Sequence, residues 1–158
     1  MEMVLFTGIP AAGKSEFYKR HFYKTHIRIN LDMLGMRQRE RILIDACLAA
    51  KHSFVVDNMN LTAAIRNQYI TVAKKNGFKV VGFYFRSVVN ESVLRNEQRT
   101  GREKVSLSAI HHAHAKLEPP SRSEGYDKLF YVYIKDDDFA IEEYKDDESR
   151  SRLENAVV

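Results

Sequence analysis

The most informative part of the sequence is an eight-residue run that reads Gly8-Ile9-Pro10-Ala11-Ala12-Gly13-Lys14-Ser15. It matches the pattern G-x-x-x-x-G-K-[ST], whose glycines let backbone N–H groups turn inward around phosphate oxygens. An apolar run over residues 3–7 precedes it and predicts a buried strand, and residues 14–22 predict a helix. Because the first turn of a helix carries partial positive charge, this strand, loop and helix together predict a phosphate-binding site.

Residues 8–15 form a predicted phosphate loop, and its last two residues, Lys14 and Ser15, have predicted roles in binding a nucleotide. Lys14 is expected to reach the β- and γ-phosphates of a nucleoside triphosphate, and the Ser15 hydroxyl is expected to ligate Mg²⁺. We therefore expect ATP, or another nucleoside triphosphate, and Mg²⁺ as cofactors. The next residue is Glu16, where a hydroxyl often contacts the α-phosphate, so that contact is not expected here. The alternative is a glycine-rich turn that binds no ligand.

Strand-like and helix-like segments alternate along the rest of the chain. Hydrophobic periodicity predicts strands at residues 3–7, 26–30, 53–57, 78–85 and 128–134, and helices at residues 14–22, 33–50, 62–76, 90–98 and 106–117. Thr62 and Ser106 are predicted to cap the helices that begin at them. This alternation predicts an α/β domain over residues 1–135, with a parallel five-stranded sheet and helices on both faces. An acidic tail over residues 136–158 is expected to follow.

Composition bounds the class of protein. The 158 residues are 44% hydrophobic and 29% charged, which is typical of one globular domain and excludes a disordered chain. No apolar run reaches the ~18 residues that a membrane span needs, so we expect no membrane partner. One cysteine, Cys47, excludes an internal disulfide, and a reducing cytoplasm is the simplest location.

The net charge of +4 is unevenly divided. Residues 136–158 hold nine acidic and three basic side chains, whereas residues 1–135 hold 12 acidic and 22 basic ones. A basic domain favours an anionic partner such as a nucleic acid, although a soluble domain with a solvating tail explains the division equally well. The tail either competes with nucleic acid for the basic domain or packs on it through Phe139, Ile141 and Tyr144.

Carboxylates follow two of the predicted strands. Asp32 comes after the strand at residues 26–30, and Asp57 ends the strand at residues 53–57. In sheets of this type, ligands bind beyond the carboxyl ends of the strands. Asp32 is therefore a candidate general base near the γ-phosphate, or else a helix cap. Asp57 is a candidate Mg²⁺ ligand, or else the start of an Asx-turn.

Four arginines are candidate anion ligands. Arg39 is predicted to point inward from the helix at residues 33–50, where it would need an anionic partner, and Arg37 beside it either contacts substrate or lies on a solvated face. Arg95 and Arg99 share one helix face and lead into a basic loop, which could close over the triphosphate as a short lid. The alternative for this pair is an exposed helix end, where the helix dipole favours cations.

Taken together, these residues resemble the P-loop kinase module of the 5′-hydroxyl polynucleotide kinase family. The resemblance covers about residues 3–133 and includes Asp57-Asn58-Met59-Asn60, which is similar to the Asp-Asn-Thr-Asn or Asp-Thr-Asn segment of the family. It implies that Asp32 is the general base, that Arg39 contacts the phosphate at the acceptor end, and that Arg99 acts on the transferred phosphate. It also places Asn60 in a segment of the substrate site. Glu118-Pro119-Pro120 and Glu124-Gly125-Tyr126 are similar to a signature of the wider group of small ATP-binding kinases.

The resemblance implies an enzyme that transfers the γ-phosphate of a nucleoside triphosphate to 5′-hydroxyl ends of DNA or RNA, as in the healing of nucleic acid ends. Two other functions remain open from the residues alone. One is a kinase of a small molecule, such as an antibiotic, a sugar or a nucleoside. The other is a nucleotide-binding regulatory protein without catalysis.

Overall fold

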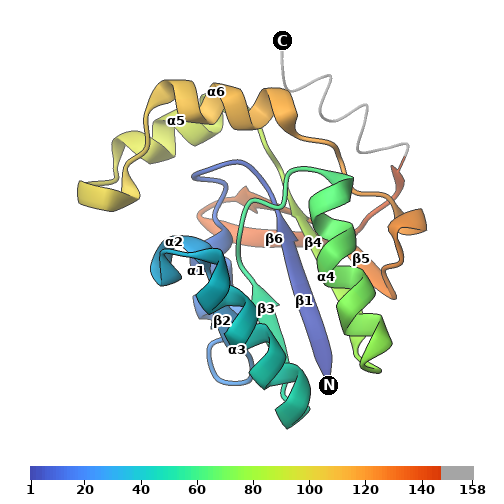
Figure 1. The fold of residues 1–158 in the computed structure, drawn as a ribbon. Helices are drawn as coiled ribbons and strands as arrows, with labels where there is room; N and C mark the ends of the chain where they lie inside the picture. Colours follow the sequence, from blue (N-terminus) through green and yellow to red (C-terminus); the bar gives the residue numbers. More distant parts are fainter. Residues whose placement is uncertain (147–158) are drawn as a thin grey trace.

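A six-stranded sheet runs through the computed structural model, which describes residues 1–146 (Figure 1). The strands lie in the order β2-β3-β1-β4-β5-β6, and all neighbours are parallel except β5 and β6. Their bounds are β1 Glu2–Thr7, β2 Ile27–Ile29, β3 Phe54–Val56, β4 Lys79–Phe85, β5 Lys128–Lys135 and β6 Asp138–Glu143. The predicted α/β fold with helices on both faces is therefore confirmed, with one strand more than the five predicted.

Helices cover both faces of this sheet. Their bounds are α1 Lys14–His21, α2 Leu31–Leu34, α3 Arg37–Ala50, α4 Ala63–Lys75, α5 Val89–Glu97 and α6 Leu107–Lys116, with short 3-10 turns η1 Gly101–Glu103 and η2 Arg122–Glu124. Helices α3 and α4 pack on one face, and α1 and α6 pack on the other. No helix within residues 1–146 is long and apolar enough to cross a membrane.

The alternation of side chains along β1 explains how one strand serves both layers. Met3 and Leu5 join the core beneath α3 and α4, whereas Val4 and Phe6 join the core beneath α1 and α6. All four are essentially inaccessible to solvent. A parallel strand that is covered on both faces needs such a continuous apolar run. Gly8, the first residue of the phosphate loop, follows directly after this strand.

The helix predicted over residues 33–50 is two helices. Gly35 adopts a left-handed conformation with φ of +81° and ends α2, so α3 starts anew at Arg37. This break shifts the buried stripe of α3 to Glu40, Ile44, Cys47 and Leu48. The prediction that Arg39 points inward is therefore wrong: its side chain is exposed, and its neighbour Glu40 is buried instead.

The sheet continues past residue 135, where we expected an acidic tail to begin. Strand β6 pairs with β5 so that Ile134 faces Phe139, and the Phe139 ring packs edge-on against Phe17 of α1. Tyr144, just after β6, is buried. Phe139 and Tyr144 pack on the domain as the second alternative above predicts, whereas Ile141, the third residue of that prediction, is 44% exposed. The remaining acidic residues, 147–158, lie outside the described part of the chain.

A buried arginine ties α4 to the loops around β1. Arg66 is fully buried and donates to both carboxylate oxygens of Glu124, at 2.8 and 3.2 Å, and to the backbone oxygen of Asn60 at 2.9 Å. Asn60 adopts φ of +47°, and its side-chain amide donates to the backbone oxygen of Phe6 at 2.7 Å. The end of β1, and hence the entrance to the phosphate loop, is held through this chain of contacts.

Replacing Arg66 by Met should lower the free energy of unfolding by about 3–5 kcal/mol, because it leaves the Glu124 carboxylate without its buried partner. Urea unfolding followed by circular dichroism measures the change. Lys75→Met, at an exposed position of the same helix, is the control and should shift the free energy by no more than about 0.5 kcal/mol. A loss for Arg66→Met as small as the control's would contradict this account of the ion pair.

Candidate functional site

The phosphate loop leaves β1 and turns sharply into α1. Ala11 and Gly13 both have positive φ, +60° and +99°, and Gly13 begins α1 without any side-chain cap. The first N–H groups of the helix therefore remain available to an anion. The loop is fastened from outside by Ser87, whose hydroxyl accepts from the Ile9 N–H at 3.1 Å. Ser87 was not singled out in the sequence, because it follows β4 and its contact is formed only in the folded chain.

Lys14 lies at the centre of the predicted site. Its ammonium donates to the backbone oxygens of Gly8 and Ile9, at 3.0 and 2.7 Å. Burial lowers the pKa of Lys14 to about 8, nearby Asp57 and Asp32 act to raise that pKa, and nearby Arg99 lowers it further. The structure thus brings these four predicted residues close enough together for their charges to interact.

The two predicted metal ligands meet beside Lys14. Ser15 Oγ lies 3.4 Å from Asp57 Oδ2, and Asp57 is 1% exposed at the end of β3. A hydroxyl and a carboxylate are the hard oxygen donors that Mg²⁺ takes in proteins. A cationic group, the guanidinium of Arg28 from β2, already lies against both oxygens, at 3.0 Å from Ser15 Oγ and 2.8 Å from Asp57 Oδ2. The donor set therefore fits a cation such as Mg²⁺.

Arg28 itself is absent from the sequence-based predictions. The available signal was an arginine between Ile27 and Ile29, in the middle of a strand that neighbours the one ending at Asp57. A charged residue in the interior of an apolar strand needs a partner, and the position of Asp57 makes it the partner. Neither Arg28 nor Asp57 predicts this contact by itself, because the two residues belong to different strands.

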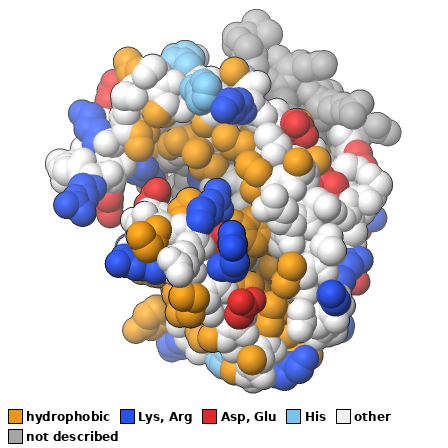
Figure 2. Space-filling model, viewed as in Figure 1, with side chains coloured by type: hydrophobic (Ala, Val, Ile, Leu, Met, Phe, Trp, Pro, Cys, Tyr) orange, Lys and Arg blue, Asp and Glu red, His pale blue; other side chains and the backbone are white. Residues whose placement is uncertain are grey.

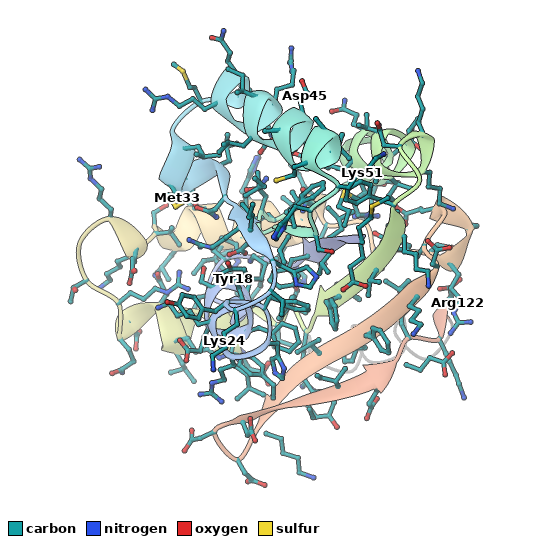
Figure 3. The ribbon with its side chains drawn as sticks, turned by 90° about the horizontal axis from the view of Figure 1, so that it is seen from below. Tyr18, Lys24, Met33, Asp45, Lys51 and Arg122 are labelled. Atoms are coloured by element: carbon teal, nitrogen blue, oxygen red, sulfur yellow. The ribbon has the colours of Figure 1, made fainter. Side chains whose placement is uncertain are left out.

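Asp32 lies on α2 with its carboxylate exposed. Asn30, not Asp32, caps this helix by accepting from the Met33 N–H at 2.9 Å, so the helix-cap alternative for Asp32 is wrong. Asn58, from the loop after β3, accepts from the Leu31 N–H at 2.8 Å and fixes α2 beside the metal ligands. No residue within 1–146 donates a hydrogen bond to the Asp32 carboxylate, which leaves it free for a substrate. Figure 3, where Met33 marks α2, shows this helix on the side of the molecule that carries the loop between α5 and α6.

The predicted lid is the loop between α5 and α6, residues 98–106. Arg95 donates to the backbone oxygen of Ala11 at 2.8 Å, and burial lowers its pKa. Arg99, farther out, donates to the backbone oxygen of Glu103 and lies near enough to Lys14 to affect its charge. Buried Asn96 closes the loop through two hydrogen bonds with the backbone of Val105, at 2.7 and 3.0 Å. Arg95 therefore hydrogen-bonds to the phosphate loop, whereas Arg99 hydrogen-bonds within the lid and acts on Lys14 through its charge.

The predicted substrate residues are not gathered with the others. Arg39 donates to the backbone oxygen of Leu34 at the end of α2, at 2.9 Å. Arg37 bonds to Glu40 and to the Tyr69 hydroxyl, in a groove of about 430 Å³ between α3 and α4. Asn60 is 4% exposed and faces Phe6. Of the three, Arg39 is the one that hydrogen-bonds to α2, the helix that carries Asp32. A role in binding substrate stays a prediction for all of them.

Basic side chains lie on two sides of a hollow in the surface of the molecule (Figure 2). Figure 2, in the view of Figure 1, shows Lys and Arg side chains at the lid and again over α2 and α3, with the hollow between them. Two basic flanks on either side of a concave surface favour an anionic ligand between them.

The chain is similar to known proteins in sequence and in fold. A family model described as an AAA domain matches residues 3–120. The L-seryl-tRNA(Sec) kinase of Methanococcus maripaludis is 26% identical over 145 residues, which cover 79% of this chain and 56% of the relative. The chain therefore spans little more than half the length of the curated relative that it matches.

Two solved structures have the same fold. Chaetomium thermophilum Kti12 in complex with ADP-AlF3 superposes with a TM-score of 0.61 at 16% identity and 99% coverage of both chains. A chain of the PezAT toxin-antitoxin system of Streptococcus pneumoniae superposes with a TM-score of 0.56 at 11% identity, with 98% of this chain and 85% of that chain covered. At such identities the similarity concerns the fold alone.

Affinity for a nucleotide in the absence of metal should fall as the pH rises above about 8. The pKa of Lys14 in the free protein is lowered to about 8, whereas bound phosphates favour the charged amine, so binding above this pH takes up a proton. The dissociation constant of ADP should be constant below pH 8 and rise by up to about tenfold per pH unit above it.

Calorimetry at pH 7 to 9, in two buffers of different ionisation enthalpy and with a metal chelator present, measures both the affinity and the proton uptake. Lys14→Arg is the matched control, because guanidinium stays charged over this range and its pH profile should be flat. Binding of ADP to the wild-type chain without proton uptake at pH 9 would show that Lys14 is already fully charged there.

Proposed function

This chain belongs to the AAA domain family, and from that premise we propose that it is a kinase that transfers the γ-phosphate of ATP, or another nucleoside triphosphate, to the 5′-hydroxyl end of DNA or RNA. The chain is a small P-loop kinase-like protein, and a nucleotide-binding or kinase role follows from its family and its curated relative. The observation that supports phosphoryl transfer is that Asp57, Arg99 and Asp32 lie close enough to Lys14 for their charges to interact. The nucleic acid acceptor rests on the basic charge of residues 1–135.

These residues suffice for phosphoryl transfer. The backbone of the phosphate loop cradles the phosphates, and Ser15 and Asp57 would hold Mg²⁺, which neutralises charge on the β- and γ-phosphates when it is bound. Asp32 accepts the proton of the acceptor hydroxyl as its oxygen bonds to the γ-phosphorus. The bond from the γ-phosphorus to the bridging oxygen breaks, and ADP leaves with the electron pair. Lys14 and Arg99 stabilise the negative charge of the transferring group.

The charge of the domain supports a nucleic acid acceptor. Residues 1–135 carry ten more basic than acidic side chains, and basic flanks border the hollow beside α2. A protein that neutralises several phosphates binds more weakly as salt rises, because the released counterions must be recaptured. Activity on a small uncharged alcohol would lack this dependence, so the salt profile separates the two classes of acceptor.

A second acceptor is favoured by one observation, the 26% identity to a kinase whose name gives seryl-tRNA as its substrate. Both acceptors present a hydroxyl beside a nucleic acid phosphate backbone, and Asp32 would serve as base for either. The 5′-hydroxyl is the first choice because Arg39 borders α2, where it could hold the phosphate adjacent to a terminal hydroxyl.

Transfer of labelled γ-phosphate decides between these acceptors. The panel contains 5′-hydroxyl DNA and RNA oligonucleotides, the same oligonucleotides with a 5′-phosphate as matched controls, seryl-tRNA, and small alcohols. We expect label only on the 5′-hydroxyl oligonucleotides. Label on seryl-tRNA alone would move the function to the second acceptor, label on alcohols alone would contradict a nucleic acid substrate, and no label on any acceptor would contradict a kinase.

Asp32→Asn should lower kcat by about 10²- to 10⁴-fold, the usual loss when a general base is removed. The dissociation constant of ATP should change far less than kcat, because Asp32 acts on Lys14 only through its charge and forms no hydrogen bond to the phosphate loop within the described residues. Steady-state kinetics and equilibrium binding measure the two quantities separately. Asp45→Asn, an exposed carboxylate on α3, controls for the loss of one negative charge. If Asp32→Asn retains the wild-type rate, another group accepts the proton.

A further inference from the structure

Arg28 occupies the space between the two metal ligands. Its Nε donates to Asp57 Oδ2 at 2.8 Å, and its Nη2 donates to Ser15 Oγ at 3.0 Å. The side chain reaches this place from the middle of β2, where Arg28 lies beside Val55 of β3, two residues before Asp57. It is 26% exposed, so most of its surface lies against protein.

The environment explains why a cation is needed there. Asp57 is 1% exposed, and a buried carboxylate without a partner is strongly unfavourable. Lys14, the other cation nearby, directs its ammonium at the backbone oxygens of Gly8 and Ile9. Arg28 is therefore the cation that hydrogen-bonds to Asp57 in the nucleotide-free chain.

The position is supported from the side. The guanidinium carbon of Arg28 lies 5.9 Å from the ring centroid of Tyr18 on α1, a residue labelled near the centre of Figure 3. This distance is within the range of a cation–π contact. The Tyr18 hydroxyl in turn donates to the backbone oxygen of His26 at 2.7 Å, which joins α1 to the start of β2. Arg28 is thus held by three contacts, of which only two involve the metal ligands.

We propose that Arg28 is a built-in counter-cation of the metal site, which neutralises Asp57 in the nucleotide-free protein and is displaced when Mg²⁺ enters with the nucleotide. Mg²⁺ would be held by Ser15 Oγ and Asp57 Oδ2, the same two oxygens to which Arg28 now donates. A guanidinium that stayed on both oxygens would lie in contact with the bound cation, which charge repulsion disfavours. The inference rests on the metal site of the proposed function, but not on the identity of the acceptor.

Displacement makes metal binding conditional on the nucleotide. Without phosphates, Mg²⁺ would merely exchange one positive partner of Asp57 for another, and it would have to shed water to do so. With a triphosphate on the loop, the added negative charge offsets the loss of the Arg28 contact, and the guanidinium retains the ring of Tyr18 as a neighbour. Arg28 therefore suppresses binding of free metal and sets the metal concentration that nucleotide binding requires.

The test compares the full wild-type chain with Arg28→Gln, which keeps hydrogen-bonding capacity but removes the charge. Electron paramagnetic resonance of free Mn²⁺ measures metal binding with and without a non-hydrolysable ATP analogue, and no acceptor is present. Arg28→Gln should bind Mn²⁺ without nucleotide at least about tenfold more tightly than the wild type. Arg41→Gln, an exposed arginine on α3, is the charge-matched control and should equal the wild type.

Thermal unfolding supplies a second readout. Arg28→Gln should unfold at a lower temperature than the wild type when metal and nucleotide are absent, and saturating Mg²⁺ with the ATP analogue should remove most of that difference. A purely structural Arg28 gives the opposite result: Mn²⁺ affinity equal to or below that of the wild type, and a deficit in Tm that persists with ligands bound. Either of these two outcomes overturns the proposal.

Arg28→Lys keeps the test decisive if the Gln variant does not fold. Lysine retains the positive charge but cannot donate to Ser15 and Asp57 in a fixed fork. Its Mn²⁺ affinity without nucleotide should exceed that of the wild type, and equality would contradict the displacement. Because acceptor is absent from every arm, failure of the kinase proposal would appear only in the phosphoryl-transfer assay and not here.

Discussion

The arrangement of the site depends on one buried carboxylate, that of Asp57. Its side chain receives hydrogen bonds from Arg28 of β2 and Ser15 of α1, and its backbone oxygen accepts from the Asn30 side chain at 2.6 Å. Two strands, the first helix and the entrance to α2 therefore meet at one residue. Burying the negative charge there is tolerable only because these partners surround it, and their positions are fixed as a result.

The sequence was sufficient where the determinants are local. A phosphate loop, an apolar parallel strand and a helix cap each need only a few adjacent residues, and the predicted caps at Thr62 and Ser106 are confirmed. The predicted placement of Arg39 was wrong because Gly35 interrupts the helix and shifts the register of the buried stripe. The role of Arg28 was not predicted, because its two hydrogen-bond partners are distant in the sequence: Ser15 lies 13 positions before it and Asp57 lies 29 positions after it.

The acceptor side of the site is harder to predict than the nucleotide side for a physical reason. Phosphate binding uses backbone N–H groups whose geometry a short motif specifies. The proposed acceptor would instead contact side chains such as Asp32, which is exposed on α2 and whose surroundings form only in the folded chain. The family accordingly indicates nucleotide chemistry with more precision than it indicates the receiving molecule.

The hairpin of β5 and β6 packs against the phosphate loop, although the two segments are far apart in the sequence. A side-chain carbon added at Gly13 would lie 3.0 Å from the Phe139 ring and 3.3 Å from Ile134, while Arg20 of α1 contacts both Phe139 and Asp138. The last strand of the described chain therefore packs against the phosphate loop. A residue larger than glycine at position 13 would have to displace Phe139 and Ile134, so side chains more than 120 residues later in the sequence limit which residue the loop can hold there.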